Sequence, residues 1–346
     1  LDSTHPDDVK GILDVDPEQT LFVISSKSGE TIETLSHLKV VVERLGQAKL
    51  KVSDHVVVIT DPGSPLAKWA TDSQVRIFYG EPTVGGRFSA LSIFGLLPAA
   101  LLGADCATLL DDAAEMKSIL CNSTESNLAI RLSQEIIESQ PFLQLPKTPL
   151  SDWIEQLVAE STGKDGTGII PVVSSESDLL PTVRESLQLP LGGAFYLWEW
   201  TTALLGYLLQ VNPFDQPDVA GAKEGTRRAL SSALPLGEKT IKSSAELLSY
   251  LESLQKSATN PLAHSDGYLA ILAFVPSRKG ATRDSIFSIR QGLHHKFGKS
   301  TPITIGFGPR YLHSTGQCHK GGPTHGVFLI ITLDERIDYP IPGVDY

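Results

Sequence analysis

The chain has 346 residues, which at about 150 residues per domain corresponds to roughly two domains. Hydrophobic residues make up 41% and charged residues 20%, a globular composition that excludes collagen-like and largely disordered proteins. Acidic residues outnumber basic ones by 40 to 29, and the net charge of -11 disfavours nucleic acid as a partner. Three scattered cysteines provide neither a disulfide framework nor a CxxC zinc pair, so we expect a cytoplasmic protein.

Membrane insertion and secretion find no support in the sequence. The longest apolar run, residues 93–104, is shorter than a membrane span and is interrupted by Pro98. No basic region leads into an apolar stretch at the start, so we expect no signal peptide. Because Leu1 is not an initiator methionine, we expect the chain to be a piece of a longer protein.

Short apolar runs alternate with helical patterns at the start of the chain. We predict strands at 21–24, 55–60 and 75–79, and a helix at 32–45, where apolar residues recur every three or four positions. Such alternation favours parallel strands with helices on both faces of the sheet. We therefore predict an α/β fold of two doubly wound parallel sheets, with ligands at the carboxyl ends of the strands.

The composition changes at the acidic helical stretch 103–115, where we expect one domain to end. We assign residues 1–105 to a first domain and 106–346 to a second. In the second domain we predict helices at 153–160 and 194–209, strands at 168–173, 268–275, 302–306 and 326–332, and a helix between the second and third of these strands.

A polar turn joins the first strand to the first helix. It offers the hydroxyls of Ser26, Ser28 and Thr31 and the amine of Lys27, where free backbone N–H groups and the helix dipole favour an anion. We predict a phosphate site at this turn. Its spacing is not that of a Walker loop, and the alternative is that Ser28 only caps the helix.

Three further segments contain candidate site residues. Arg87 follows Gly86 on a glycine-permissive turn that suits contact with an oxyanion, although it could equally be a surface arginine. Glu160 is predicted at a helix C-terminus, where the dipole would raise its basicity as a general base needs; the alternative is a solvated glutamate. Gln216 and Lys223 follow a helix break and could face one cleft, unless the segment is only a helix stop capped by Asp215.

A loop rich in glycine and histidine, residues 306–323, follows a predicted strand. We weigh three interpretations: a metal cluster of His313, His319 and His325, a nucleophilic Cys318–His319 pair, or structural glycines alone. The histidines lack an HExxH pattern and a paired carboxylate, so we expect no metal.

One window of the chain is markedly basic. Residues 278–299 contain six lysines and arginines against a single acidic residue, Asp284. We expect a solvated helix face; the alternative is contact with a phosphate or an acidic partner.

Five motifs, in this order, resemble the glucose-6-phosphate isomerase family, whose members contain two sugar-isomerase (SIS) domains. They are VISSKSGET at 23–31, GGRFS at 85–89, QLVAESTGK at 156–164, NPFDQP at 212–217 and GPRYLHSTGQ at 308–317. The last of them, with HKGGP at 319–323, is most similar to the isomerase half of bifunctional transaldolase/phosphoglucose isomerases. The resemblance extends from about residue 20 to residue 332.

This resemblance implies an aldose-ketose isomerase that interconverts glucose 6-phosphate and fructose 6-phosphate through an enediolate. It implies that Ser26, Lys27, Ser28 and Thr31 hold the phosphate, that Gly86 and Arg87 face the developing negative charge, and that Glu160 moves the proton between C1 and C2. Gln216 and Lys223 would close the site. No metal or redox cofactor is implied; we expect a homodimer and a transaldolase domain upstream in the parent chain.

Two features depart from the family pattern. Family members have a ring-opening histidine soon after the glutamate, whereas no histidine follows Glu160 before His264. We assign that role to His313, in a loop that resembles the family loop moved to the C-terminus, with His319 as the second choice. The first domain lacks the usual upstream sugar-binding loop, which suggests an N-terminal truncation.

The alternative function is a non-catalytic SIS-type module that binds sugar phosphates for regulation. Such a sensor needs the turn at 25–31 but no general base, so Glu160 in its full motif favours the enzyme. Phosphomannose isomerase activity is a further possibility, because the sequence does not distinguish it from glucose-6-phosphate isomerase activity.

Overall fold

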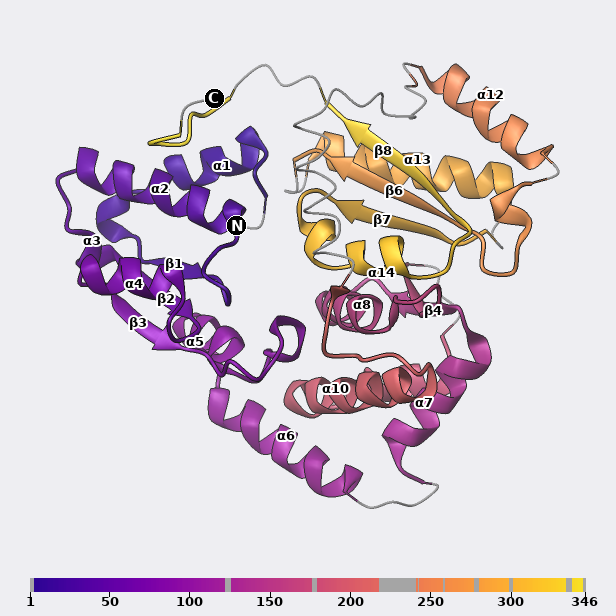
Figure 1. Cartoon of the computed structure of the whole chain (residues 1–346), viewed down its shortest axis with the longest axis horizontal. Helices are drawn as coiled ribbons and strands as arrows, with labels where there is room; N and C mark the ends of the chain where they lie inside the picture. Colours follow the sequence, from indigo (N-terminus) through magenta and orange to yellow (C-terminus); the bar gives the residue numbers. More distant parts are fainter. Residues whose placement is uncertain are drawn as a thin grey trace.

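The computed structural model of the chain describes residues 3–121, 126–175, 179–217, 241, 243–257, 259–276, 280–298, 301–333 and 338–344. Their strands form three sheets, ordered β1-β2-β3, β4-β5 and β7-β6-β8, and all the strand pairs are parallel (Figure 1). The predicted α/β class with parallel sheets is thus confirmed. Among these residues, no helix is both long and apolar enough to cross a membrane.

The first sheet contains the strands that we predicted in the first hundred residues. Its elements are α1 (Pro6–Leu13), η1 (Pro17–Gln19), β1 (Phe22–Ser25), α2 (Ile32–Gln47), α3 (Val52–His55), β2 (Val56–Thr60), α4 (Pro65–Asp72) and β3 (Arg76–Tyr79). One apolar cluster, built around Leu45, Val56 and Val58, joins this sheet to α2 and α4. The carboxyl end of β1 leads directly into the predicted phosphate turn.

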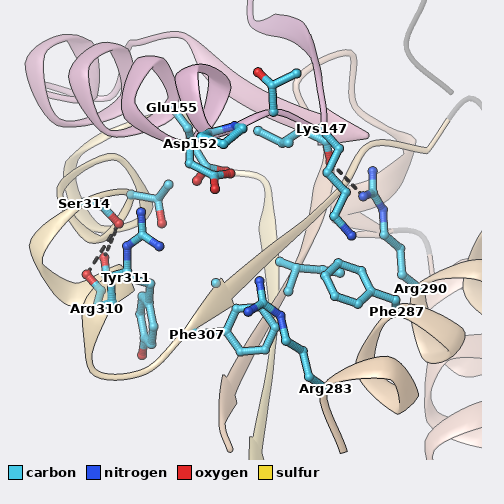
Figure 2. A pocket seen from close by; sticks show the side chains of 16 residues that line it. Lys147, Asp152, Glu155, Arg283, Phe287, Arg290, Phe307, Arg310, Tyr311 and Ser314 are labelled. Carbon is cyan, nitrogen blue, oxygen red and sulfur yellow. Dashed lines mark hydrogen bonds between the residues drawn. The ribbon is translucent and has the colours of Figure 1, made fainter. Parts of the chain in front are cut away.

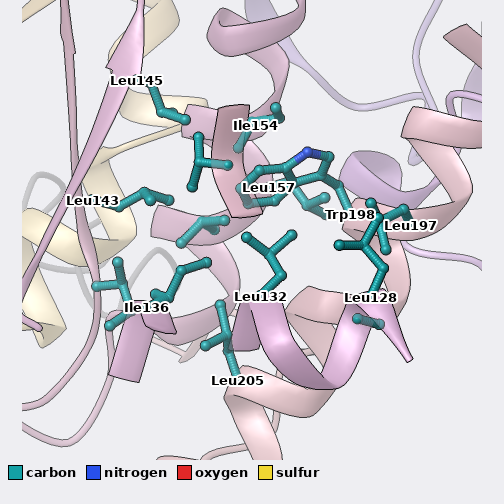
Figure 3. Close-up of a cluster of buried hydrophobic side chains, with 14 of the residues drawn as sticks. Leu128, Leu132, Ile136, Leu143, Leu145, Ile154, Leu157, Leu197, Trp198 and Leu205 are labelled. Atoms are coloured by element: carbon teal, nitrogen blue, oxygen red, sulfur yellow. The ribbon is translucent and has the colours of Figure 1, made fainter. Parts of the chain in front are cut away.

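Helices dominate the middle of the chain, and a short sheet lies beside them. The elements are η2 (Gly86–Phe88), α5 (Ile93–Leu101), α6 (Cys106–Leu120), α7 (Leu128–Ser139), β4 (Phe142–Pro146), α8 (Pro149–Thr162), β5 (Ile170–Ser174), α9 (Pro181–Ser186) and α10 (Leu191–Leu208). Their side chains form the largest core, with Trp198 fully buried among leucines and isoleucines (Figure 3).

The third sheet is built from the strands predicted near the end of the chain. Its elements are α12 (Ser244–Gln255), η3 (Pro261–Ala263), β6 (Tyr268–Phe274), α13 (Ala281–Phe297), β7 (Ile303–Phe307), η4 (Arg310–His313), α14 (Gly316–Gly321) and β8 (Gly326–Thr332). In Figure 1, α14 lies between this sheet and α8, and η4 packs against α14. This packing brings the glycine- and histidine-rich loop to the helix that contains Glu160.

Glu199 on α10 is a charged side chain in a largely apolar helix. Burial raises its pKa to about 8, and its Oε1 has no hydrogen-bond partner among the described residues. Because the folded-state pKa lies above the unfolded value, the carboxyl favours folding most at low pH, and this contribution is lost as pH rises through about 8.

We expect Glu199→Gln to remove this loss, since the amide stays neutral. The urea concentration at the unfolding midpoint of the wild type should decrease as the pH is raised from 5 to 8.5. That of the variant should decrease less. The exposed Glu115→Gln is the matched control. A variant that loses stability over this pH range as steeply as the wild type would show that Glu199 is not the group responsible.

Candidate active site

Arg87 lies at the centre of a buried hydrogen-bond network. Its side chain is only 3% exposed, and its Nε donates to Ser161 Oγ at 2.7 Å. Nη1 donates to Glu160 Oε1 at 3.1 Å and to Gln216 Oε1 at 3.3 Å. The structure therefore brings together three residues that we selected from separate motifs, and the interpretation of Arg87 as a surface arginine is wrong.

The second terminal nitrogen of Arg87 is bound to backbone. Nη2 donates to the carbonyl oxygens of Pro213 and Asp215, at 2.6 and 2.8 Å. A planar guanidinium can donate to acceptors that lie in different directions, because its five N–H groups diverge in fixed directions. Arg87 thus orients the segment that contains Gln216 as well as the carboxylate of Glu160.

Glu160 lies in the last turn of α8, which ends two residues later at Thr162. Burial raises the pKa of this carboxyl, while Arg87, a hydrogen bond from Gln156, His313 and Lys164 act to lower it. The pKa is raised, as predicted, but the predicted cause was the helix dipole and the principal cause is burial. A carboxylate with raised basicity beside a fixed cation is suited to accept a proton.

Lys164 is a site residue that we did not single out, although it ends the quoted motif. Its buried Nζ donates to the carboxylate and the carbonyl of Asp215, each at 2.7 Å, and to the carbonyl of Asn212. Asp215 therefore does not cap α10, which ends at Leu208. The pair instead holds the segment 212–217 against the end of α8.

His313 extends from η4 towards two other parts of the chain. Its Nε2 donates to Glu33 Oε1 on α2 at 3.0 Å, and its carbonyl accepts from Gln156 Nε2 at 2.9 Å. Gln156 Nε2 also donates to Glu160 Oε2, at 3.3 Å. The hydrogen bond from His313 is the main cause of a lowered pKa at Glu33. The backbone carbonyl of His313 is thus linked to Glu160 through Gln156, while its imidazole binds Glu33.

The loop that contains His313 is held against α8 by close backbone contact. A Cβ at Gly163 would lie 2.3 Å from Cα of Cys318, so only glycine fits there. Gln317 Nε2 donates to the carbonyl of Gly163 at 3.0 Å, and the N–H of Gly166 donates to the carbonyl of Gly321 at 2.8 Å. These contacts fix the loop that contains His313 against the C-terminal end of α8, where Gly163 permits the close approach.

The surroundings of Cys318 and His319 argue against a nucleophilic pair. Burial raises the pKa of Cys318 to about 12 and lowers that of His319 to about 4, so neither the thiolate nor the imidazolium forms near pH 7. His319 Nδ1 is hydrogen-bonded to the hydroxyl of Tyr268 at 3.0 Å. His319 is therefore a poor alternative to His313 for ring opening.

The three histidines considered for a metal each have a different hydrogen-bond partner, which is Tyr268 for His319. His325 pairs with Asp266 at 2.8 Å and stacks on His264 at 3.7 Å between ring centroids, while His313 binds Glu33. His264, Asp266 and His325 do offer ligand atoms within 4.8 Å of one another. Stacked, nearly parallel imidazoles direct their lone pairs within separate planes, however, and not towards one point.

The predicted phosphate turn is shaped by its own hydroxyls. Ser26 Oγ donates to Thr31 Oγ1 at 3.0 Å and accepts from the N–H of Gly29 at 3.1 Å. Gly29 has a positive φ of 68°, and a Cβ there would lie 2.8 Å from Ser64. Ser28 accepts from the N–H of Glu30, whereas the N-cap residue of α2 is Thr31, so Ser28 does not cap that helix.

Lys27 is already paired within the first sheet. Its Nζ contacts Asp61 Oδ2 at 2.7 Å and donates to the carbonyl of Glu81 at 2.8 Å. The hydroxyls and N–H groups of the turn are therefore better placed for an anion than this amine.

At Gly86 a Cβ would meet nothing within 4 Å, so that this side of the residue is open. Lys223 lies outside the described residues.

The chain is similar in sequence to isomerases of known families. The family model of phosphoglucose isomerase matches residues 1–144. A probable glucose-6-phosphate isomerase of Natronomonas pharaonis is 36% identical over 181 residues, which is 49% of this chain and 42% of that protein. The glucose-6-phosphate isomerase of Carboxydothermus hydrogenoformans is 36% identical over 179 residues, covering 47% and 38%. The chain spans less than half the length of the curated relatives it matches.

Two solved structures resemble the fold. A hypothetical protein from Thermus thermophilus superposes with a TM-score of 0.58 and 27% identity, covering 67% of this chain and 77% of that one. A glucose-6-phosphate isomerase from Chlamydia trachomatis gives a TM-score of 0.53 at 19% identity, covering 73% and 66%. The second likeness concerns the fold alone.

Proposed function

We propose that this chain belongs to the glucose-6-phosphate isomerase family and contains the site at which glucose 6-phosphate and fructose 6-phosphate are interconverted. The observation that carries the proposal is the buried contact between Arg87 and Glu160 beside the His313 loop. The matches of residues 1–144 and of about half the chain to such isomerases support it.

The proposed chemistry follows from these side chains. Glu160 removes the proton at C2 of the open-chain aldose, and the electrons move onto the carbonyl oxygen at C1 to give an enediolate. The same carboxylic acid then returns the proton to C1 while the hydroxyl proton moves from O2 to O1, which leaves a hydroxyl at C1 and the carbonyl at C2 of the ketose. Arg87 stabilises the negative charge of the enediolate without reorganisation, because its partners already fix it.

The remaining parts of the site bind the substrate. We propose that Ser26, Ser28, Thr31 and the N–H groups of the turn hold the phosphate, with Lys27 contributing long-range charge, and that Gly86, Gln216 and Lys223 surround the sugar. A non-catalytic sensor would not need a buried carboxylate of raised pKa, so this geometry favours the enzyme. A coupled assay with fructose 6-phosphate and glucose-6-phosphate dehydrogenase tests the proposal, and absence of turnover would contradict it.

We propose a domain boundary at residues 105 and 106, where α6 begins. The apolar cluster of the first sheet lies within residues 12–77, which supports a separate first domain. We also propose a cytoplasmic homodimer whose parent chain includes a transaldolase domain. The mass of the parent protein in solution and its transaldolase activity test these points.

We expect His313→Ala to slow the turnover of cyclic glucose 6-phosphate far more than proton exchange at C2 of an open-chain substrate analogue. The reason is that an imidazole, with an ordinary pKa of about 6.5, can move the proton between the ring oxygen and the C1 hydroxyl. Steady-state turnover and exchange of the C2 proton into deuterated water measure the two steps.

Glu33→Gln serves as the companion variant, because Glu33 only positions the imidazole. It should produce a smaller loss with the same preference for the cyclic substrate. Equal losses of both reactions in His313→Ala would mean that His313 braces its loop and does not open the ring.

A further inference from the structure

A pocket lies against the loop that contains His313. It has a volume of about 390 Å³, within the range of small-molecule sites, and it opens between β5 and β7 (Figure 2). The residues that follow β4 and the end of β7 both line it, so it lies at the carboxyl ends of parallel strands. The proposed isomerase site includes none of its lining side chains.

Positive charge predominates in this pocket. Lys147, Arg283, Arg290 and Arg310 all line it, against Asp152 and Glu155. Burial raises the pKa of Glu155 to about 8, so at pH 7 this carboxyl is mostly protonated. Among the described residues that line the pocket, basic side chains thus outnumber acidic ones, and a cleft with an excess of positive charge concentrates anions.

Aromatic rings hold two of these cations in position. The Nζ of Lys147 lies 3.6 Å from the ring centroid of Phe287, and the guanidinium of Arg283 lies 4.8 Å from that of Phe307. Contact with the face of an aromatic ring attracts a cation and so helps to orient it. From the sequence we expected the basic window at 278–299 to be a solvated helix face, with contact to a phosphate or an acidic partner as the alternative. Arg283 and Arg290 from that window line the pocket.

A buried hydroxyl supports a polar ligand. Thr315 lines the pocket and is only 7% exposed, yet its Oγ1 has no hydrogen-bond partner among the described residues. A buried hydroxyl without a partner costs free energy, because it has lost its hydrogen bonds to water. A ligand oxygen in the pocket would supply the missing bond.

We propose that this pocket binds a small phosphorylated molecule, with its phosphoryl group between Arg283, Arg290 and Lys147 and with Thr315 donating to one of its oxygens. The phenyl rings of Phe287 and Phe307 form the apolar wall. The occupied pocket would also stabilise the loop 310–315, because Arg310, Ser314 and Thr315 line the pocket on either side of His313. The proposal concerns binding and does not depend on isomerase activity.

Calorimetric titration with inorganic pyrophosphate at pH 7 tests this site. We expect saturable binding that Arg283→Gln weakens about tenfold or more, as loss of a charge-assisted hydrogen bond implies. Thr315→Val keeps the shape without the hydroxyl and should weaken binding by a smaller factor.

Two controls separate this pocket from other sources of anion affinity. Lys117→Gln makes the same change in net charge on exposed α6, and Ser26→Ala alters the phosphate turn; both should retain the affinity lost in Arg283→Gln. The proposal is overturned if pyrophosphate does not bind, if Arg283→Gln binds it like the wild type, or if only Ser26→Ala abolishes binding.

Discussion

Replacement of Glu160 by glutamine should reduce kcat by at least about 10²-fold while leaving KM nearly unchanged. The amide keeps the shape of the carboxylate and can still accept from Arg87 Nη1, which lies 3.1 Å from Glu160 Oε1. It cannot take up the proton at C2, however, so the substrate should bind and not react. Steady-state kinetics with glucose 6-phosphate and fructose 6-phosphate measure both parameters.

The pH dependence of the wild type provides a second test of Glu160. The base acts only when ionised, and burial raises its pKa, so kcat should fall on the acid side at a pH above the ordinary range of a glutamate. Glu138→Gln, at the exposed end of α7, should retain the wild-type rate and profile. Wild-type turnover in Glu160→Gln would remove this residue from the mechanism.

Much of the fold could be predicted because its strands are short apolar runs closed by turn residues. The runs that became β1, β2 and β6 have that form, and parallel pairing followed from the helices between them. The strand β4 was missed, although Leu143 and Leu145 alternate inward, because Pro146 closes it and proline argues against a strand interior. This proline is tolerated since it ends a strand that pairs only with β5 in the described residues.

Less of the site than of the fold could be predicted from the individual residues. The motifs selected Arg87, Glu160 and Gln216, and these residues lie in contact. Gln156 precedes Glu160 by one helical turn, so the four-residue spacing could have identified it. Glu33 gave no local signal, because its partner His313 lies 280 residues further along the chain.

The helix dipole, which we predicted as the cause of the raised basicity of Glu160, is not the principal cause, and local sequence could not have shown this. A helix end can be read from local sequence, whereas burial depends on what packs over it. Here the covering groups come from η2, from the segment 212–217 and from the His313 loop. Such burial is a property of the tertiary structure and could not be derived from the neighbourhood of Glu160 alone.

Arg87→Lys should lower kcat by about 10²-fold, in the range found when one donor to a developing oxyanion is removed, with a smaller effect on KM. Arginine donates through three nitrogens to Ser161, Glu160, Gln216 and two backbone carbonyls. A lysine has one nitrogen and cannot reproduce these directions, although it keeps the charge. The enediolate would then meet a cation whose position is no longer fixed.

The same substitution should also destabilise the segment 212–217, because the buried carbonyl of Pro213 loses its donor and the carbonyl of Asp215 keeps only its bond from Lys164. The matched control is Arg131→Lys, since Arg131 pairs with Glu185 at 3.0 Å on the surface, where such pairs contribute little. We expect Arg131→Lys to keep both kcat and the urea midpoint. An increase in KM alone for Arg87→Lys would make Arg87 a substrate-binding group that does not stabilise the transition state, since only interactions that strengthen in the transition state raise kcat.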